Sequence, residues 1–534
     1  MKLSFYGADQ CVTGSCHCLE VNGKRILIDC GLQQGRDEIS NGEFPFAANT
    51  IDIVLVTHAH IDHSGRIPML VKQGFQGRIL TTRLTAKLLE IMLLDSAHIQ
   101  EQDAEWRNRK GERSGAPKTE PLYTVEDAEQ VMQYMTTCEY GQFVELCEGV
   151  TVEFVDAGHL LGSACIAMDL VENGVKKSIV FSGDLGNINQ PIIRDPVHFR
   201  GADYVVMEST YGDRNHMGTW NYSEDLAKII DETMARGGNV IIPSFAVGRT
   251  QELLYFIREI KEQHLVKSVP DFPVYIDSPL ARKATTIFDG DLRGYMDLEA
   301  VQLVRKGTKM IQFPNLCMTE TSEESRELNT DPTPKVIISA AGMCDAGRIR
   351  HHLKHNLWRP ECTILFVGYQ AEGTLGRSLL EGAKTVKLFG EEIAVQAHLE
   401  NFKGLSSHAD RDHLIQWIAD FTDPAPQQVF VVHGDREVAP FFAQTLENMG
   451  IAAHAPQYTE VYDLATNTLL ERGYLPERKP IKTAGSSKST PAYERLVSIG
   501  NMVTESIRRS KGRDNKSLAK FADQLRLLLE KWEA

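Results

Sequence analysis

Residues 52–63 read DIVLVTHAHIDH, an apolar run followed at once by three histidines and an aspartate. The apolar run has the length and the β-branched content of a buried strand. Imidazole and carboxylate groups are the donors that zinc and similar divalent ions prefer in proteins. A lone histidine is usually a surface residue that binds no metal, but a turn that presents four donors is hard to explain by packing. The four donors are His58, His60, Asp62 and His63. We expect the first two to face one metal ion and the last two to face a second.

Two further residues complete the set, since four donors are too few for two metal sites. His159 lies in a glycine-flanked loop, DAGH at 156–159, after an apolar run. Asp184 follows the strand-like run SIVF at 178–181. Each of them alone is typical of a turn. Together with the cluster they supply the missing donors.

Other apolar runs in the first part of the chain also end in polar or glycine residues. The runs at 24–30 and 204–207 read as buried strands, and they end at Asp29 and Glu208. Catalytic groups gather where strands end in loops, because strands fix the geometry and loops allow access. A helix is expected at 84–109.

From residue 223 the pattern changes to long helices between buried strands, which favours a parallel α/β unit. The expected helices cover 226–236 and 250–262, and the expected strands cover 239–243, 274–277, 336–339 and 363–367. A later strand at 428–432 ends in His433. Residues 476–492 have the composition of a linker, and 493–509 and 517–532 have amphipathic helical patterns.

The order of these motifs resembles the metallo-β-lactamase superfamily. Its members show an HxHxDH cluster, then a distant histidine and a distant aspartate at a strand end, and Asp29 matches their first motif. Three later residues narrow the likeness to the β-CASP nucleases, because Glu208, His408 and His433 match motifs A, B and C of that subfamily. The match covers residues 1 to about 475. Within that subfamily, the sequence is similar to the nuclease subunit of the eukaryotic pre-mRNA cleavage and polyadenylation machinery and to the bacterial and archaeal relatives of that subunit.

The resemblance implies an α/β fold, namely a metallo-β-lactamase αββα sandwich with an inserted α/β β-CASP domain and a short helical C-terminal tail. The implied boundaries are 1–213 and 385–475 for the two parts of the sandwich, 214–384 for the insert, and 476–534 for the linker and helical extension.

The resemblance also implies a ligand set for two Zn²⁺ ions, with Mn²⁺ as the alternative. Asp184 bridges the two ions in this superfamily, and Asp29 supports a ligand without touching metal. The seven implied ligands are His58, His60, Asp62, His63, His159, Asp184 and His433.

The implied activity is that of a zinc-dependent endoribonuclease acting on single-stranded RNA. A hydroxide held by both metals attacks phosphorus, and the metals stabilise the charge that develops. His408 supplies a proton to the leaving 3′ oxygen, while Glu208 holds and charges its imidazole. Asp62 is counted with these two as catalytic. The histidine at position 433 favours RNA, because the DNA-repair branch of the family has valine there.

Strand-to-helix turns of the insert are expected to hold substrate phosphates. Small residues in such turns let backbone amides approach an anion, and arginine makes bidentate contacts with phosphate. The expected phosphate contacts are Arg249, Ser339, Gly342, Arg348 and Arg377. Glycine-rich turns are equally common as connections between strands and helices that bind no ligand. These five residues could therefore have a purely structural role instead.

The formal net charge of −15 argues against a general nucleic-acid partner, because phosphate binding needs Lys and Arg. Residues 476–534 carry 13 Lys or Arg against 7 Asp or Glu, so any basic groove must be local. A solvated helix face is the simpler interpretation of that basic tail.

The sequence shows no membrane-spanning stretch, signal peptide or CxxC pair. We therefore expect a cytoplasmic protein with reduced thiols and no membrane partner.

Three other functions compete with the endoribonuclease: a 5′-exoribonuclease, a small-molecule hydrolase such as a thioesterase or lactonase, and a non-catalytic RNA-binding scaffold. The insert and the pair Glu208 and His408 disfavour a small-molecule hydrolase, and the complete ligand set disfavours a scaffold. The sequence leaves open the cleavage mode, the physiological RNA, RNA-processing partners and a homo-oligomeric state.

Overall fold

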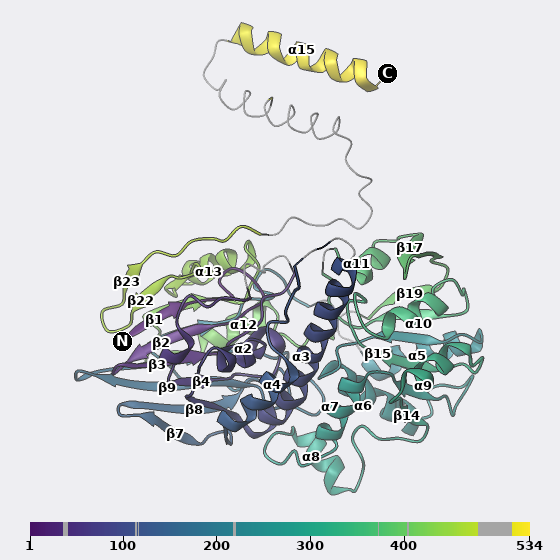
Figure 1. The fold of residues 1–534 in the computed structure, drawn as a ribbon, viewed down its shortest axis with the longest axis horizontal. Helices are drawn as coiled ribbons and strands as arrows, with labels where there is room; N and C mark the ends of the chain where they lie inside the picture. Colours follow the sequence, from purple (N-terminus) through teal and green to yellow (C-terminus); the bar gives the residue numbers. More distant parts are fainter. Residues whose placement is uncertain are drawn as a thin grey trace. The chain divides into compact units, whose positions relative to one another are not determined.

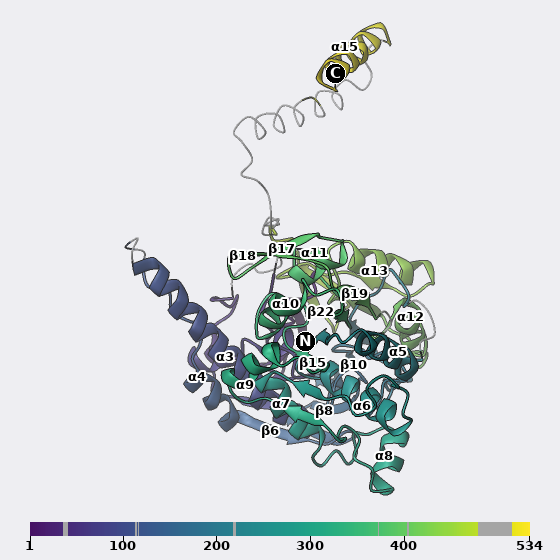
Figure 2. The same ribbon diagram turned by 90° about the vertical axis from the view of Figure 1, so that its right-hand side faces the viewer.

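The structure is a computed structural model that describes residues 1–35, 41–112, 115, 117–216, 221–371, 373–402, 405–478, 503 and 515–533. The chain separates into two units, Met1–Pro480 and Ile481–Ala534. The first unit holds two large mixed sheets and a third, parallel sheet (Figures 1 and 2).

The first large sheet has eight strands in the order β23-β22-β1-β2-β3-β4-β5-β6. The strands from β3 to β6 run parallel, and the others pair antiparallel. The strands are β1 (Lys2–Phe5), β2 (His17–Val21), β3 (Lys24–Ile28), β4 (Ile53–Leu55), β5 (Arg78–Thr82), β6 (Met135–Cys138), β22 (Val461–Asp463) and β23 (Thr468–Glu471). The strands predicted at 24–30 and 52–57 are β3 and β4, so both predictions are confirmed.

The second large sheet has seven strands in the order β21-β20-β11-β10-β9-β8-β7. Its strand β8 alternates buried and half-buried residues, as expected of a strand that faces a core on one side. The strands are β7 (Phe143–Cys147), β8 (Val150–Asp156), β9 (Ala164–Glu172), β10 (Val175–Phe181), β11 (Tyr204–Met207), β20 (Gln428–Val431) and β21 (Ala453–His454).

The two sheets pack face to face around one apolar core, to which Phe5, Ile28, Phe154 and Phe430 all contribute buried side chains. Burial of such side chains is the main force that holds the sheets together. Helices cover both outer faces. The first sheet is covered by α2 (Ile67–Lys72), α3 (Arg83–Gly111) and α4 (Val125–Val131), and the second by α12 (Arg411–Ala419) and α13 (Val438–Asn448). The predicted αββα sandwich is confirmed.

The third sheet has six parallel strands in the order β14-β13-β15-β12-β16-β19. These are β12 (Val240–Pro243), β13 (Val274–Ile276), β14 (Leu316–Met318), β15 (Val336–Ser339), β16 (Thr363–Phe366) and β19 (His398–Asn401). The predicted parallel α/β unit is therefore present. Its last strand, β19, lies outside the range 214–384 that was expected for the insert.

Helices lie on both faces of this parallel sheet. One face carries α5 (Tyr222–Ala235), α6 (Arg249–Glu262) and α7 (Pro279–Phe288). The other face carries α9 (Ser322–Thr330), α10 (Ile349–Asn356), α11 (Leu375–Leu380) and the hairpin of β17 (Thr385–Leu388) and β18 (Glu391–Ala394). The short helix α8 (Leu298–Arg305) follows α7 in the chain.

The second unit contains helix α15 (Asn515–Glu533), which includes the helix predicted at 517–532. The helix predicted at 493–509 lies outside the described residues, apart from Val503. Among the residues that the structure describes, no helix is both long enough and apolar enough to cross a membrane.

Candidate metal centre

The predicted metal donors meet at one edge of the sandwich, where strands of both large sheets end. His58 follows β4, His159 follows β8, Asp184 follows β10 and His433 follows β20. The short helix α1 (Ile61–Ser64) carries Asp62 and His63 in a single turn, and His60 directly precedes it. The fold thus brings together residues such as His63 and His433, which lie 370 positions apart in the chain.

One group of donors, called here the first donor group, consists of His58, His60, His159 and Asp184. His60 Nδ1 lies 3.1 Å from His58 Nε2 and 3.2 Å from His159 Nε2. Asp184 Oδ2 lies 3.5 Å from the same two Nε2 atoms. Four donor atoms from three separate segments of the chain therefore surround one point.

The nitrogen contacts of His60 fit a cation better than they fit hydrogen bonds. A ring nitrogen offers either one proton or one lone pair, so His60 Nδ1 can make a proper hydrogen bond with only one of its two nitrogen neighbours. A cation can accept lone pairs from all three nitrogens. Bonds of about 2.0–2.1 Å to tetrahedral zinc place neighbouring donors about 3.3–3.4 Å apart, close to the spacing seen here. The cluster therefore fits a metal cofactor.

The second donor group consists of Asp62, His63 and His433. His433 Nε2 lies 3.2 Å from His63 Nε2 and 3.5 Å from Asp62 Oδ2. Asp184 reaches this group through its other oxygen, because Oδ1 lies 3.2 Å from His63 Nε2. The Asp184 carboxylate thus directs one oxygen to each donor group, and the structure divides the HxHxDH donors into the same two pairs as the sequence pattern predicts.

Four histidines of the centre have a partner for the second ring nitrogen. His58 Nδ1 lies 3.1 Å from Thr57 Oγ1, and His159 Nδ1 lies 3.0 Å from the carbonyl oxygen of Ser407. The remaining contacts join His433 Nδ1 to Thr210 Oγ1 at 3.1 Å and His63 Nδ1 to Asp29 Oδ2 at 2.7 Å. Such contacts fix the ring orientation and the tautomer of metal-binding histidines.

Asp29 is held rigidly beneath the cluster. It is buried, and its Oδ1 accepts a hydrogen bond of 2.8 Å from the backbone N–H of Thr57. Its backbone has a φ of +62°, and His433 has a φ of +47°. Residues other than glycine rarely adopt this left-handed conformation, which costs about 1–3 kcal/mol and is found chiefly at functional sites.

The buried charges of the second donor group shift the pKa values of its members. Burial disfavours ionisation of Asp62, but the hydrogen bond with His433 and the nearby His63 outweigh it and lower the Asp62 pKa to about 2. Burial likewise opposes the charging of His63, yet the carboxylates of Asp184 and Asp29 raise its pKa well above the usual value. The carboxylates therefore favour the binding of positive charge at this edge of the sandwich.

Glu208 and His408 form a pair beside the first donor group. Glu208 is fully buried, and its Oε1 accepts a 2.6 Å hydrogen bond from the backbone N–H of Leu185. The same oxygen lies 3.1 Å from His408 Nδ1, and the His408 ring centroid lies 4.5 Å from that of His159. Burial opposes protonation of His408, but the Glu208 carboxylate outweighs it and raises the pKa of His408 to about 9. The family resemblance implied this pairing.

The five residues expected to bind phosphate are engaged in other contacts. The buried Arg249 pairs with Glu252, and Arg377 pairs with Glu381 at 2.6 Å. Gly342 packs against Phe245, and its carbonyl oxygen accepts a hydrogen bond of 3.0 Å from Gln370. These contacts show that the three residues help to hold the insert together. Phosphate binding by them stays a prediction.

Ser339 and Arg348 both belong to a network around the buried Asp277, which the sequence pattern did not single out. Ser339 Oγ donates to the Asp277 carbonyl oxygen at 2.8 Å, and Arg348 pairs with the Asp277 carboxylate at 2.6 Å. His352 Nε2 lies 2.6 Å from the same carboxylate, and Ser325 donates to it at 2.6 Å. The network joins the ends of β13 and β15 to helices α9 and α10.

Sequence reasoning also missed Thr57 and Thr210, whose hydroxyl groups contact the rings of His58 and His433. Thr57 stands next to the HxHxDH cluster, and Thr210 lies two positions after Glu208. A hydroxyl residue directly beside a predicted ligand was the signal that could have revealed them.

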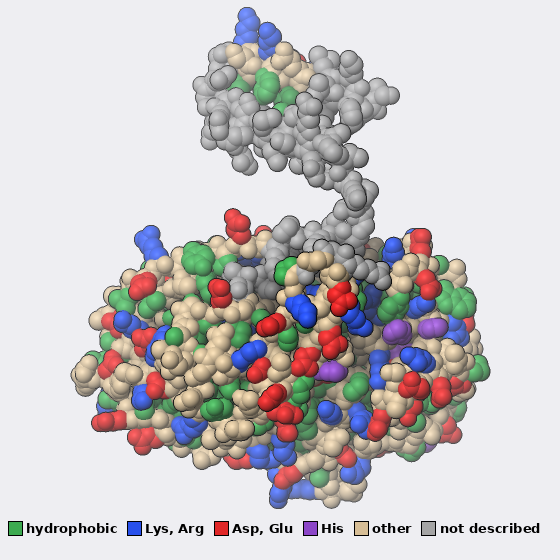
Figure 3. All heavy atoms as spheres, in the orientation of Figure 1, with side chains coloured by type: hydrophobic (Ala, Val, Ile, Leu, Met, Phe, Trp, Pro, Cys, Tyr) green, Lys and Arg blue, Asp and Glu red, His purple; other side chains and the backbone are tan. Residues whose placement is uncertain are grey.

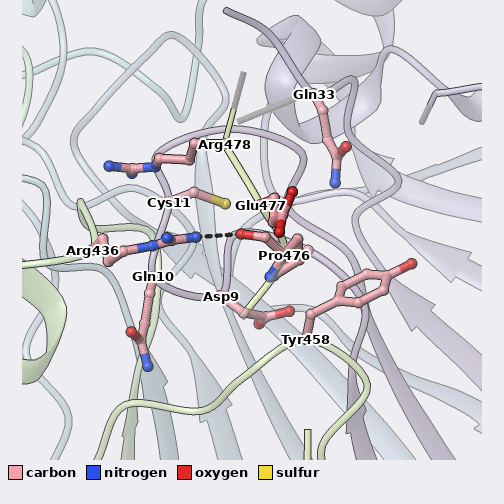
Figure 4. Close-up of a pocket in the computed structure, with 10 residues that line it drawn as sticks. Asp9, Gln10, Cys11, Gln33, Arg436, Tyr458, Pro476, Glu477 and Arg478 are labelled. Carbon is pink, nitrogen blue, oxygen red and sulfur yellow. Dashed lines mark hydrogen bonds between the residues drawn. The ribbon is translucent and has the colours of Figure 1, made fainter. Parts of the chain in front are cut away.

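A separate cavity with an empty volume of about 350 Å³ borders the loop between β1 and β2 (Figure 4). Asp9, Tyr458 and Arg436 line it, together with the segment that begins at Pro476. Burial raises the pKa of the Asp9 carboxyl well above its usual value. None of the residues that line the cavity belongs to either donor group. The cavity nevertheless adjoins the centre through the backbone, because the carbonyl oxygen of Ala8 accepts a 2.8 Å hydrogen bond from the N–H of His433.

The face of the first unit seen in Figure 3 carries acidic and basic side chains interspersed with one another. Binding of an anionic polymer to this face would therefore depend on local groups, and not on the overall field of a chain with a formal net charge of −15.

Comparisons with known families divide the chain into three matched segments. Residues 24–237 match the beta-lactamase superfamily domain, residues 250–379 match the Beta-Casp domain, and residues 392–456 match the Zn-dependent metallo-hydrolase RNA specificity domain.

Similar proteins include Ribonuclease TTHA0252 of Thermus thermophilus, which is 35% identical over 82% of this chain and 94% of that protein. The transcription termination factor FttA of Methanosarcina mazei is 29% identical over 84% of this chain and 69% of its own length. An RNase J-like protein of Methanocaldococcus jannaschii is 29% identical over 83% of this chain and 95% of its own length. A crystal structure of a protein of unknown function from Enterococcus faecalis shares the fold, with a TM-score of 0.50 and 13% identity over 88% of this chain and 99% of that one.

Proposed function

The chain belongs to the β-CASP ribonucleases of the metallo-β-lactamase superfamily, and we propose that it cuts single-stranded RNA internally with two zinc ions bound at the two donor groups. RNA hydrolysis that depends on metal is the activity of the family. The single-stranded substrate, the internal cleavage, the number of ions and the identity of the metal are the parts that we propose.

The first donor group would hold one ion and the second donor group the other, with Asp184 shared between them. The spacing of the donor atoms, 3.1–3.5 Å within each group, supports this assignment. When bound, divalent ions supply Lewis acidity, which lowers the pKa of water and neutralises phosphoryl charge. Nitrogen-rich donor sets favour zinc, and manganese is the alternative.

The observation that carries the proposal is the Glu208–His408 pair beside this centre. His408 Nδ1 faces Glu208, so its Nε2 is the atom that can hold a proton for a substrate. The His408 side chain is 20% exposed, whereas Glu208 is fully buried. A protonated, partly exposed imidazole next to the donor groups can protonate the leaving 3′ oxygen of a phosphodiester.

Glu208 acts on His408 and not on the substrate. Its carboxylate accepts backbone hydrogen bonds from Leu185 and Thr210, so its position is fixed before substrate arrives. This arrangement orients the imidazole and stabilises its charged form, as is expected of a preorganised acid. A small-molecule hydrolase on the same metal core has no need for such a pair or for the inserted parallel sheet.

A closed circle of single-stranded RNA tests the internal mode. We expect zinc-loaded protein to open the circle and then shorten the linear product. A protein that degrades linear RNA from its 5′ end and leaves the circle intact would instead be a 5′-exoribonuclease.

A further inference from the structure

Phe245 is an aromatic side chain left exposed at the edge of the parallel sheet. It follows β12, the strand flanked by β15 and β16, and 48% of its surface is accessible. Two glycines of the neighbouring loops stand beside it. A Cβ added to Gly342 would lie 3.3 Å from the Phe245 ring, and one added to Gly368 would lie 4.0 Å from it. The absence of these side chains leaves room beside the ring.

The loop that carries Phe245 is fixed by hydrogen bonds. Thr250 Oγ1 donates to the Phe245 carbonyl oxygen at 2.6 Å, and the backbone N–H of Ser244 donates to the Ser339 carbonyl oxygen at 3.0 Å. The buried Gln370 ties the two glycine loops together, because its amide donates to the carbonyl oxygens of Gly342 and Gly368 at 3.0 and 3.2 Å. The backbone that carries the ring, and the two glycine loops beside it, are therefore fixed.

Phe245 also lies at a point where the chain changes faces of the sheet. The chain leaves β12 for α6 on one face, while it leaves β15 and β16 for α10 and α11 on the other face. The loop after β12 therefore diverges from the loops after the neighbouring strands β15 and β16. In open α/β sheets, ligands bind in the crevice that such diverging loops leave at the carboxyl ends of the strands.

The Phe245 loop is continuous with the candidate metal centre. Gly248, three positions after Phe245, has a φ of +84°, and a Cβ there would lie 3.0 Å from the Leu160 side chain. Leu160 directly follows His159 of the first donor group. The loop that carries Phe245 therefore lies against the residue that follows a metal donor.

We propose that the Phe245 ring stacks against a base of the bound RNA and so positions the strand at the metal centre. The inference rests on the proposed ribonuclease function. Every base has an aromatic face, so this contact binds single-stranded RNA with little sequence preference. It also requires an unpaired base, because a base inside a duplex is covered on both faces.

The test compares Phe245→Ala, Phe245→Leu and Phe245→Trp with the wild-type chain on unstructured RNA and on bis(p-nitrophenyl) phosphate, a phosphodiester that has no base. We expect the alanine and leucine variants to raise the KM for RNA roughly 5- to 150-fold, the range set by loss of one stacked base. The tryptophan variant should keep a KM near that of the wild type. Hydrolysis of the base-free ester should not change in any variant.

Phe389→Ala is the matched control, because Phe389 has the same 48% exposure and lies on the β17–β18 hairpin. It should leave both activities at the wild-type level. Equal KM values for wild type and Phe245→Ala on RNA would overturn the inference while leaving the ribonuclease function intact, and so would an equal loss on both substrates. A wild-type chain that hydrolyses the ester but no RNA would overturn the proposed function itself.

Discussion

Glu208 and His408 lie 200 positions apart in the chain, yet Glu208 Oε1 and His408 Nδ1 are separated by only 3.1 Å. His408 Nδ1 also lies 4.0 Å from Asp184 Oδ2, so the pair stands directly beside the shared carboxylate of the two donor groups. Because Glu208 occupies Nδ1, we assign His408 to proton transfer and not to metal binding.

The substitution His408→Ala separates these two roles. We expect RNA turnover to fall about 100- to 10,000-fold, since a positioned acid contributes an effect of that size. The metal content, measured by mass spectrometry of the purified protein, should stay at the wild-type level. His198→Ala is the control, because His198 also pairs with a carboxylate, at 2.6 Å, but on the exposed surface. Loss of one metal ion per chain in His408→Ala would make His408 a ligand.

The substitution Glu208→Gln changes the pH dependence of turnover. The Glu208 carboxylate raises the pKa of His408 to about 9. A general acid works only while protonated, so activity is present below this pKa and is lost as the pH rises through it. Removal of the carboxylate lowers the pKa, and the alkaline limb of the kcat profile should therefore move to lower pH. Glu153→Gln, on strand β8, should leave the limb in place. An unmoved limb in Glu208→Gln would show that another group sets it.

The substitution Asp29→Asn weakens metal binding without removing a proposed ligand. Asp29 holds His63 through a contact of 2.7 Å and carries the charge that favours its ring orientation. Loss of such a support typically costs 10- to 100-fold in metal affinity, and competition with a chelator measures that loss. Asp156→Asn alters another buried aspartate at a strand end and should keep the wild-type affinity. Equal affinities for Asp29→Asn and wild type would contradict the role given to Asp29.

The substitution Asp9→Asn should stabilise the protein at high pH. Burial raises the pKa of this carboxyl above its usual value of 3.8, so the folded state binds the proton more tightly than the unfolded state does. The cost of the buried charge is therefore small in acid and grows as the pH rises above 3.8. We expect a gain of about 1 kcal/mol in the free energy of unfolding at pH 8, and a smaller gain at pH 5. Thermal melts at both pH values check this, and a loss of stability at pH 8 would contradict it.

The buried strands and the donor cluster could be predicted from sequence because each carries a local signal, whereas the αββα sandwich was implied by the family resemblance. The HxHxDH cluster lies within six residues, and Asp184 ends a recognisable apolar run. In a sheet sandwich, the ends of successive strands meet at a common edge, so local strand patterns also predict which distant residues come together. The Glu208–His408 pairing came from the family resemblance and not from spacing.

The ion pair of Arg348 and the exposure of Phe245 could not be predicted in this way. Arg348 is held by Asp277, a residue 71 positions earlier that ends another strand, and only the fold brings the two together. Phe245 reads as one more apolar residue after the strand at 239–243, yet the glycines that leave it exposed belong to two other loops. Strand β19 was missed as part of the insert because its sequence, HLEN, has no apolar run.

Cleavage of an internally labelled single-stranded RNA by zinc-loaded protein tests the central claim most directly, with Asp62→Ala and a DNA strand of the same sequence beside it. We predict RNA fragments from the wild-type chain, no fragments from Asp62→Ala, and an intact DNA strand. An intact RNA after incubation with wild-type protein that holds two zinc ions per chain would contradict the claim.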